Sequence, residues 1–361
     1  MQENEVSAYI SRGFLRLVSS VLTESAFDIQ ERRFLLRELR VQKKKIRLRK
    51  KQESAGLHVP PFLIASITER CNLHCKGCYA RNSGFCTEHP KEIPLSAAEW
   101  IRIFSEAEAL GISAILLAGG EPLLKYDVVF AAAELSDMIF PVFTNGTLFD
   151  EEIITLFSKS RNLFPVFSIE GNAAATDFRR GAGVFEKVSE AASALYKAGV
   201  LFGVSVTVTS ENIGDVSSDA FFSALVSAGA AVLFLVEFTA SNESERGLEL
   251  SAEHRRYLAE RLSRARMQYR SLWFLSFPGD EEFMGGCLAA ARGFFHINPF
   301  GAAEPCPFSP FSDRNLKNCS LKEAISSPLF RRISAAELTK IPHDGGCALA
   351  GRADEVEAMI K

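Results

Sequence analysis

From residue 62 onward, short apolar runs alternate with segments in which apolar residues recur at helical spacing. The runs are rich in Val, Ile, Phe and Leu, as in strands buried on both faces of a parallel sheet. We predict strands at 62–68, 113–118, 140–144, 166–170, 202–209, 231–238 and 272–277. Helices are predicted between them at 96–110, 126–136, 150–158, 185–198, 221–228 and 251–269. Six β-α units in succession predict an α/β fold, a partial (β/α)6 TIM-like barrel.

The two ends of the chain differ in pattern from this region. Residues 1–55 carry apolar residues at helical spacing before a basic run from Arg40 to Lys51, and Pro60-Pro61 follows as a helix breaker. Residues 284–312 are rich in Gly, Pro, Phe and Ala, with a hairpin expected through 294–297. We predict three domains: a helical basic extension (1–58), a barrel core (59–278) and a small C-terminal cluster-binding module (279–361).

The basic run has two interpretations. It can be a docking face for an acidic peptide or a nucleic acid. It can also be the solvated end of a helix, which we favour because a single charge run is weak evidence. The formal net charge of the whole chain is −3, which argues against strong nucleic-acid binding.

Composition places the chain among ordinary globular proteins, with 47% apolar and 24% charged residues in 361. No apolar run reaches the roughly 20 residues that span a bilayer. The first five residues, Met-Gln-Glu-Asn-Glu, lack the basic-then-apolar order of a signal peptide. We therefore expect a cytoplasmic protein with no membrane partner.

The eight cysteines of the chain fall in two groups. Because the cytosol keeps thiols reduced, these cysteines are expected to bind metal rather than to form disulfides.

The first cysteine group follows the first predicted strand. Cys71, Cys75 and Cys78 form a C-x3-C-x2-C array. Three thiolates satisfy three irons of a four-iron cube and leave the fourth open, whereas a structural zinc or a closed cluster takes four ligands. The alternative, a zinc site in which His74 joins the three cysteines, leaves the polar strand ends described next unexplained.

Polar residues and glycines end the next predicted strands. In a β-α barrel the carboxyl ends of the strands form the active site, so these residues are expected to converge beside the cysteines. Glycines there allow close backbone approach, and a carboxylate suits a cationic amine. The segments are Gly119-Gly120-Glu121-Pro122, Thr144-Asn145-Gly146, Ser168-Ile169-Glu170-Gly171, and Thr207 with Thr209 and Ser210.

With these segments, residues 62–240 resemble the radical S-adenosylmethionine (SAM) superfamily. The resemblance implies that Cys71, Cys75 and Cys78 bind a 4Fe-4S cluster whose open iron is chelated by the amine and carboxylate of SAM. It implies further SAM contacts at the strand ends: Gly119, Gly120, Glu121 and Pro122 near the methionyl amine, Thr144 and Asn145 beside them, and Ser168 and Glu170 near the ribose.

Residues 177–181 resemble the D-x-x-R-G stretch of the same superfamily. The resemblance implies that Arg180 pairs with the SAM carboxylate, a role suited to the planar guanidinium fork. The alternative is a surface arginine at the start of a helix. One departure is Gly77, where many members have an aromatic residue, so adenine packing is expected to fall to Tyr79 or to backbone.

The second cysteine group resembles the auxiliary-cluster extensions called SPASM and twitch. Cys287 and Cys306 fit their opening pattern, C-x13-G-x4-C, through Gly301. An auxiliary iron–sulfur cluster is then expected on Cys287, Cys306, Cys319 and Cys347, or on three of them with one open or non-cysteine position. Cys319 can equally be a buried thiol, and Cys86 is expected to be a bystander.

The resemblance also implies a reaction. A reduced cluster passes an electron to SAM, which releases a 5′-deoxyadenosyl radical that takes a hydrogen atom from substrate, with no acid–base dyad assigned. The substrate is expected to be a peptide, as in peptide maturation, or a cofactor precursor. The electron donor is expected to be a flavodoxin or a ferredoxin. The alternatives are an RNA-modifying radical SAM enzyme and a non-catalytic module that binds zinc and nucleic acid.

Overall fold

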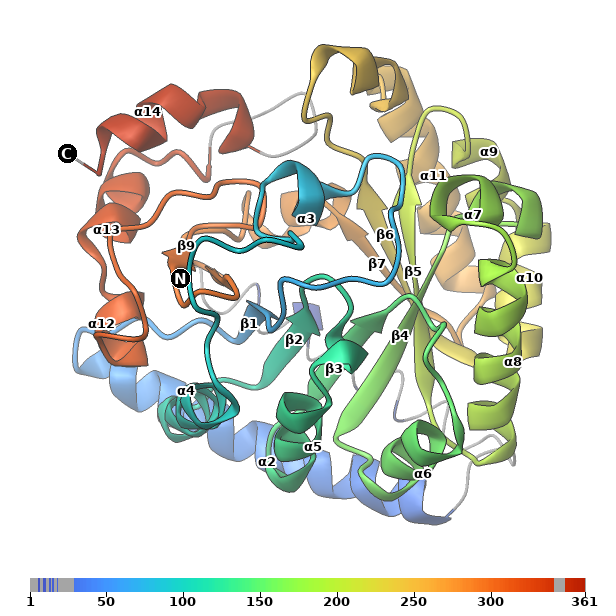
Figure 1. Cartoon of the computed structure of the whole chain (residues 1–361), viewed down its shortest axis with the longest axis horizontal. Helices are drawn as coiled ribbons and strands as arrows, with labels where there is room; N and C mark the ends of the chain where they lie inside the picture. The colour runs from blue at the N-terminus through green and yellow to red at the C-terminus, as the bar shows by residue number, and fades with distance from the viewer. Residues whose placement is uncertain are drawn as a thin grey trace.

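The computed structural model describes residues 29–340 and 348–360, together with Val6, Tyr9, Ile10, Gly13, Leu15 and Val18. Seven strands of this part of the chain pair in parallel, each with the next, in chain order (Figure 1). They are β1 (Phe62–Ser66), β2 (Ala114–Ala118), β3 (Phe140–Thr144), β4 (Leu163–Ile169), β5 (Phe202–Val208), β6 (Ala230–Glu237) and β7 (Trp273–Phe277). Each overlaps its predicted strand, which confirms the α/β class.

The sheet curls into an open barrel. Its strand order is linear, from β7 through β1 to two short strands, β8 and β9, so its two edges are not joined. The rings of Phe143 on β3 and Phe234 on β6 nevertheless lie 5.1 Å apart, although two strands separate β3 from β6. Such a contact requires the sheet to curve around a common interior, which confirms the predicted partial barrel.

Helices cover the outside of this sheet (Figure 1). They are α4 (Ala97–Leu110), α5 (Tyr126–Glu134), α6 (Glu151–Lys159), α7 (Ala173–Arg180), α8 (Val184–Lys197), α9 (Ile213–Val216), α10 (Asp219–Ala228) and α11 (Ala252–Gln268). Local signals set their ends: Ser96 and Glu99 form a capping box on α4, and Gly111 ends it at φ +91°. The predicted helices are confirmed to within two residues, whereas α7 and α9 were not predicted.

Helix α2 (Ile29–Ser54) crosses the opposite end of the barrel from the cysteine loop (Figure 1). Its contacts fall on the segments that enter successive strands: Arg49 donates to Ser113 before β2, Lys45 lies 3.5 Å from the Met138 sulfur before β3, and Glu31 pairs with Arg161 before β4. Lys45 and Arg49 are buried. The interpretation of the basic run as a solvated helix end is therefore wrong for these two residues.

The C-terminal part continues the sheet of the barrel. β8 (His296–Ile297) pairs in parallel with β1 and antiparallel with β9 (Ala303–Glu304), so the predicted hairpin is present. Buried His296 hydrogen-bonds Ser66 at 2.8 Å and Glu304 at 2.7 Å, which ties the hairpin to β1. The chain ends in α12 (Leu321–Ile325), α13 (Pro328–Ala335) and α14 (Ala353–Ala358).

Within the same described residues, no helix is both long enough and apolar enough to cross a bilayer.

Candidate active site

The cysteine loop lies at the carboxyl end of β1 and runs into the short helix α3 (Tyr79–Asn82). Cys71, Cys75 and Cys78 are all partly exposed, and Cys78 is the N-cap of α3. Burial raises the pKa of Cys71 to about 12, with Cys75 among the charges that add to it. Burial also raises the pKa of Cys75, and Cys78 adds to that shift. The three thiols are thus close enough to interact electrostatically.

Gly119 and Gly120 let the end of β2 touch the chain that leads into this loop. A Cβ on Gly119 would lie 2.6 Å from the Thr68 carbonyl oxygen, and one on Gly120 would lie 1.9 Å from that of Arg70. The two backbones instead hydrogen-bond, Gly120 N to Thr68 O at 2.9 Å and Glu121 N to Arg70 O at 2.7 Å. The glycines therefore fix the loop position, because no other residue fits there.

Glu121 joins the ends of β2 and β3. Its buried carboxylate accepts hydrogen bonds from Thr144 Oγ1 at 2.7 Å, from the Asn145 backbone at 2.8 Å and from Leu123 N at 3.2 Å. Burial raises the pKa of Glu121 to about 7, although these three donors lower it. Asn145 Nδ2 then donates to Asn72 of the cysteine loop at 2.8 Å, a contact that sequence reasoning missed.

Glu170, at the end of β4, holds two arginines. Its Oε1 accepts from Arg179 at 2.5 Å and from Arg180 at 2.6 and 2.9 Å. The Arg180 side chain is 11% exposed and lies at the end of α7, so the alternative of a surface arginine at a helix start is wrong. Its guanidinium lowers the pKa of Cys75 against the larger effect of burial.

Arg179 is the functional candidate that sequence reasoning missed. It donates to Lys76 O at 3.1 Å and to Thr207 Oγ1 at 2.8 Å, and its own carbonyl accepts from Lys76 N at 2.9 Å. Arg179 thus links the cysteine loop to the ends of β4 and β5. The sequence contains the signal, two adjacent arginines, but not which partner each one meets.

Gly77 is explained by the side chain opposite it. Its φ is +62°, and a Cβ there would lie 2.7 Å from the ring of Phe238, which follows β6. A larger residue therefore has no room, because the aromatic ring of the residue after β6 occupies the space.

The other predicted site residues lie around this centre. Tyr79 packs its ring against Phe85 and Phe308, and burial raises its pKa, with Cys78 and Cys306 adding to the shift. Tyr79 is thus near both cysteine groups. Ser168 pairs with Ser205 within the sheet, and Pro122 starts the short 3-10 helix η1 (Pro122–Leu124).

His74, the proposed fourth ligand of the zinc alternative, has another partner in the structure. His74 Nε2 lies 3.2 Å from Glu88 Oε1, and both side chains are 67% exposed, so His74 faces solvent. Among residues 29–340 and 348–360, no three His, Cys, Asp or Glu side chains are grouped closely enough to hold a single ion. In a four-iron cube each thiolate binds its own iron, so its ligands need not converge on one point.

Comparison with known proteins agrees with this geometry. A model of the radical SAM superfamily matches residues 65–222, which contain the cysteine loop, Glu121, Glu170 and both arginines. Residues 65–222 carry a radical SAM domain. With this domain and relatives that are named as enzymes, the chain is a radical SAM enzyme, and the non-catalytic alternative is set aside.

Two relatives of known name differ in their identity to this chain and in how much of it they cover. An AdoMet-dependent heme synthase of Methanosarcina barkeri is 27% identical over 317 residues, 79% of this chain and 88% of the relative. The sporulation killing factor maturation protein SkfB of Bacillus subtilis is 32% identical over 169 residues, 45% of this chain. The chain spans most of the length of the first relative but only 40% of the second.

Among solved structures, Streptococcus suis SuiB bound to S-adenosylmethionine has the same fold. The TM-score is 0.66 at 17% identity, over 80% of this chain and 73% of SuiB. The two chains thus share the open α/β barrel fold.

The residues present fit the cofactors of the superfamily. The cysteine loop offers three thiols without a fourth ligand from His74, and the guanidinium of Arg180 beside Cys75 favours its thiolate. Both an anionic cluster and the carboxylate of SAM are compatible with a mouth that holds two arginines.

The structure describes three members of the second cysteine group. Cys287 and Cys306 are buried, whereas Cys319 is half-buried near Arg102 and Glu106 of α4. Cys347 lies outside the described residues. Cys86 is buried against the first loop, in an apolar cluster that Cys71 and Cys78 also contact, so it is a neighbour of that loop.

Proposed function

We propose that the chain binds a 4Fe-4S cluster on Cys71, Cys75 and Cys78 and uses SAM to start radical chemistry on a substrate. When bound, the cluster and SAM supply the electron and the 5′-deoxyadenosyl radical that removes a hydrogen atom from substrate. The observation that carries the proposal is the cysteine loop itself, held on one side by Gly119 and Gly120 and on the other by Arg179.

The residues around the loop would hold SAM and exclude water. Gly119, Gly120, Glu121 and Pro122 would face the methionyl amine, with Thr144 and Asn145 fixing the Glu121 carboxylate. Arg180, oriented by Glu170, would pair with the SAM carboxylate. Ser168 and Glu170 would lie near the ribose, and Phe238 or Tyr79 would offer the aromatic surface for adenine.

A peptide is the substrate class that we favour. SkfB is named as a maturation protein of a killing factor, and SuiB has been solved with its precursor peptide SuiA, over 84% of this chain with a TM-score of 0.64. A cofactor precursor is the second candidate, because the similarity to a heme synthase extends over 79% of the chain. An RNA substrate has no comparable support. The electron donor would be a flavodoxin or ferredoxin.

The C-terminal module would hold an auxiliary iron–sulfur cluster. Cys287 and Cys306 are the core of the ligand set that we propose, with Cys347 and Cys319 as the further ligands. The position of Cys306 beside Tyr79, which also neighbours Cys78, supports a centre close to the first one.

Anaerobic reconstitution tests the proposal. The loaded protein is expected to be brown, to contain iron and sulfide, and to form 5′-deoxyadenosine from SAM under strong reductant. The variant with Cys71, Cys75 and Cys78 changed to Ala is expected to lose that activity but to keep the iron of the auxiliary centre. Colourless wild-type protein that holds only zinc would refute the first cluster, and an iron-free triple variant would refute the second.

A further inference from the structure

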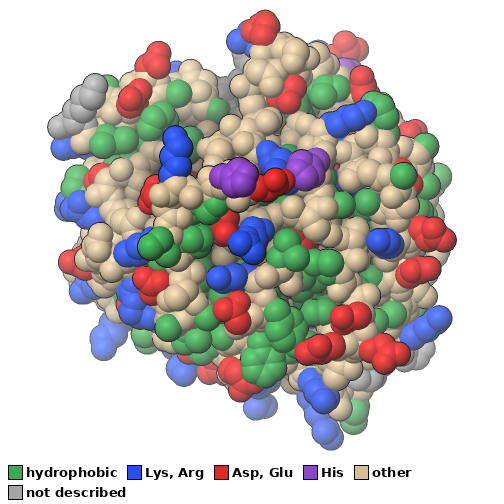
Figure 2. Space-filling view, in the orientation of Figure 1, with side chains coloured by type: hydrophobic (Ala, Val, Ile, Leu, Met, Phe, Trp, Pro, Cys, Tyr) green, Lys and Arg blue, Asp and Glu red, His purple; other side chains and the backbone are tan. Residues whose placement is uncertain are grey.

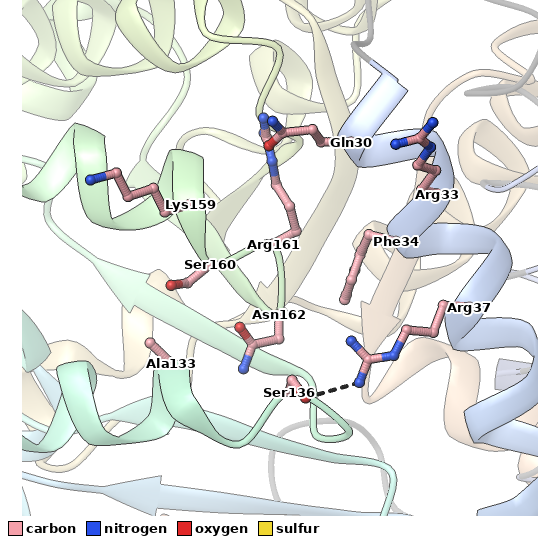
Figure 3. A pocket seen from close by; sticks show the side chains of 10 residues that line it. All are labelled: Gln30, Arg33, Phe34, Arg37, Ala133, Ser136, Lys159, Ser160, Arg161 and Asn162. Carbon is pink, nitrogen blue, oxygen red and sulfur yellow. Dashed lines mark hydrogen bonds between the residues drawn. The ribbon is translucent and has the colours of Figure 1, made fainter.

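A pocket of about 360 Å³ lies between α2 and the amino-terminal ends of β3 and β4 (Figure 3). One wall is the N-terminal half of α2, and the other comes from the segments that precede the two strands. The lining residues are Gln30, Arg33, Phe34, Arg37, Ala133, Ser136, Lys159, Ser160, Arg161 and Asn162. This pocket is at the opposite end of the barrel from the cysteine loop, so the radical chemistry does not use it.

The lining contains four cationic side chains and no carboxylate. Arg37 is paired with Asp137, and Arg161 with Glu31. Arg33 and Lys159 are exposed at the rim, and no acidic side chain in residues 29–340 or 348–360 forms an ion pair with either of them. Two positive charges of the pocket are therefore not neutralised by those parts of the chain.

The positive charge continues along the outer face of α2. Figure 2 shows Lys and Arg side chains along the edge of the molecule over which α2 runs in Figure 1. The exposed cations beyond the pocket are Arg40, Lys43, Lys44, Arg47, Lys50 and Lys51. Asp137, 4.0 Å from Lys44, is the one acid paired with any of these six within the described residues. From Arg33 to Lys51 the basic face runs along about 28 Å of α2, at roughly 1.5 Å per residue.

We propose that the pocket and this basic face bind an acidic segment of the peptide substrate, an inference that rests on the peptide form of the proposed function. The pocket would take acidic side chains at its rim, where Arg33 lies on one wall and Lys159 on the other, with Phe34 and Ala133 as apolar surface. The stripe of cations on α2 would attract the acidic residues that flank it. A peptide is favoured over a nucleic acid because the similar proteins SkfB and SuiB are named with a killing factor and with a precursor peptide.

The position of the pocket sets a minimum spacing in such a substrate. β4 has seven residues and rises about 23 Å at roughly 3.3 Å per residue from the pocket end of the barrel to the mouth. An extended peptide covers at most about 3.3–3.6 Å per residue. At least about seven residues would then separate the anchored acidic segment from the residue that reacts.

Fluorescence anisotropy with a labelled twelve-residue peptide of Glu, Asp, Gly and Ser tests this inference. The intact chain is expected to bind the probe, and the double variant R33E/K159E to bind at least about tenfold more weakly. Raising the salt from about 0.1 M to about 1 M is expected to weaken binding, because the screening length falls from about 10 Å to about 3 Å. The matched control K187E/K322E makes the same charge change at exposed lysines of α8 and α12 and is expected to bind like wild type.

Three results would overturn the inference: no binding by wild type, equal binding by R33E/K159E, or tighter binding of a single-stranded RNA of equal length. The measurement needs neither cluster nor SAM. Absence of binding with intact 5′-deoxyadenosine formation would therefore refute the docking site alone. Binding without SAM cleavage would refute the proposed function alone.

Discussion

At the residue scale, Gly77 and Gly84 share a backbone conformation but differ in their surroundings. Their φ values are +62° and +83°, so each lies in the left-handed region. A Cβ on Gly77 would meet the ring of Phe238 at 2.7 Å, whereas a Cβ on Gly84 would meet nothing within 4 Å. The pair therefore separates the cost of backbone strain from the cost of a steric clash.

We predict that Gly84→Ala lowers the free energy of unfolding by about 1 kcal/mol, because an alanine is strained at the positive φ that the folded chain requires there and meets no steric clash. Gly77→Ala is expected to cost about 1–3 kcal/mol more, through the contact with Phe238. Chemical denaturation of the two variants measures the difference. In a Phe238→Ala background, Gly77→Ala should cost less than it does in the wild-type chain, because the clashing ring is absent. Equal destabilisation by the two glycine variants would contradict the steric explanation.

Single residues also show the limit of sequence reasoning at the site. The three cysteines and the polar strand ends could be predicted, because their spacing and place in the β-α pattern reflect local chemistry. The role of Arg179 and the fit of Phe238 over Gly77 could not. Both depend on contacts between residues more than 100 positions apart, which no local pattern encodes.

At the element scale, α2 has a polar buried face. Leu35 and Val41 are buried as its spacing predicts, but so are Glu38 and Lys45. Burial raises the pKa of Glu38 to about 7 and lowers that of Lys45 to about 8. The helix could be predicted from its apolar spacing, but its position across the barrel could not, because charged residues share the buried face.

The raised pKa of Glu38 predicts a pH dependence of stability. The stabilisation from its protonated form is fully present below the unfolded value of 4.5 and is lost as the pH rises through about 7. A glutamine at position 38 cannot ionise. The free energy of unfolding of Glu38→Gln minus that of the wild-type chain is therefore expected to increase by about 2 kcal/mol between pH 5.5 and pH 8.

Urea denaturation at the two pH values measures this change. Glu134→Gln is the control, because Glu134 is exposed on α5 and its carboxylate is solvated in both states. A difference between Glu38→Gln and wild type that stays constant with pH would show that Glu38 does not titrate in this range.

At the scale of the whole molecule, α2 before the seven parallel strands and β8 after them are both joined to the barrel. Leu35 of α2 belongs to the same apolar cluster as Leu201, Ala231 and Leu275 of the barrel core. β8 extends the sheet beside β1. The α/β class and the order of the strands could be predicted from the repeating pattern. The attachment of β8 could not, because a two-residue strand carries no periodicity of its own. The division of the chain into three domains, with boundaries at residues 58 and 278, stays a prediction.

Deleting residues 1–55 tests whether the helical extension is a separable domain. We expect the truncated chain to lose cooperative unfolding, because removing α2 exposes the barrel residues that it covers and leaves the Gly111 carbonyl without its bond from Arg49. Thermal unfolding followed by circular dichroism, with size-exclusion chromatography, measures the effect. The full-length variant R40E/K43E, which changes two exposed cations of α2, should remain folded. A truncated chain that is monomeric, unfolds cooperatively and binds as much iron as the full chain would show instead that residues 1–58 form a separate domain.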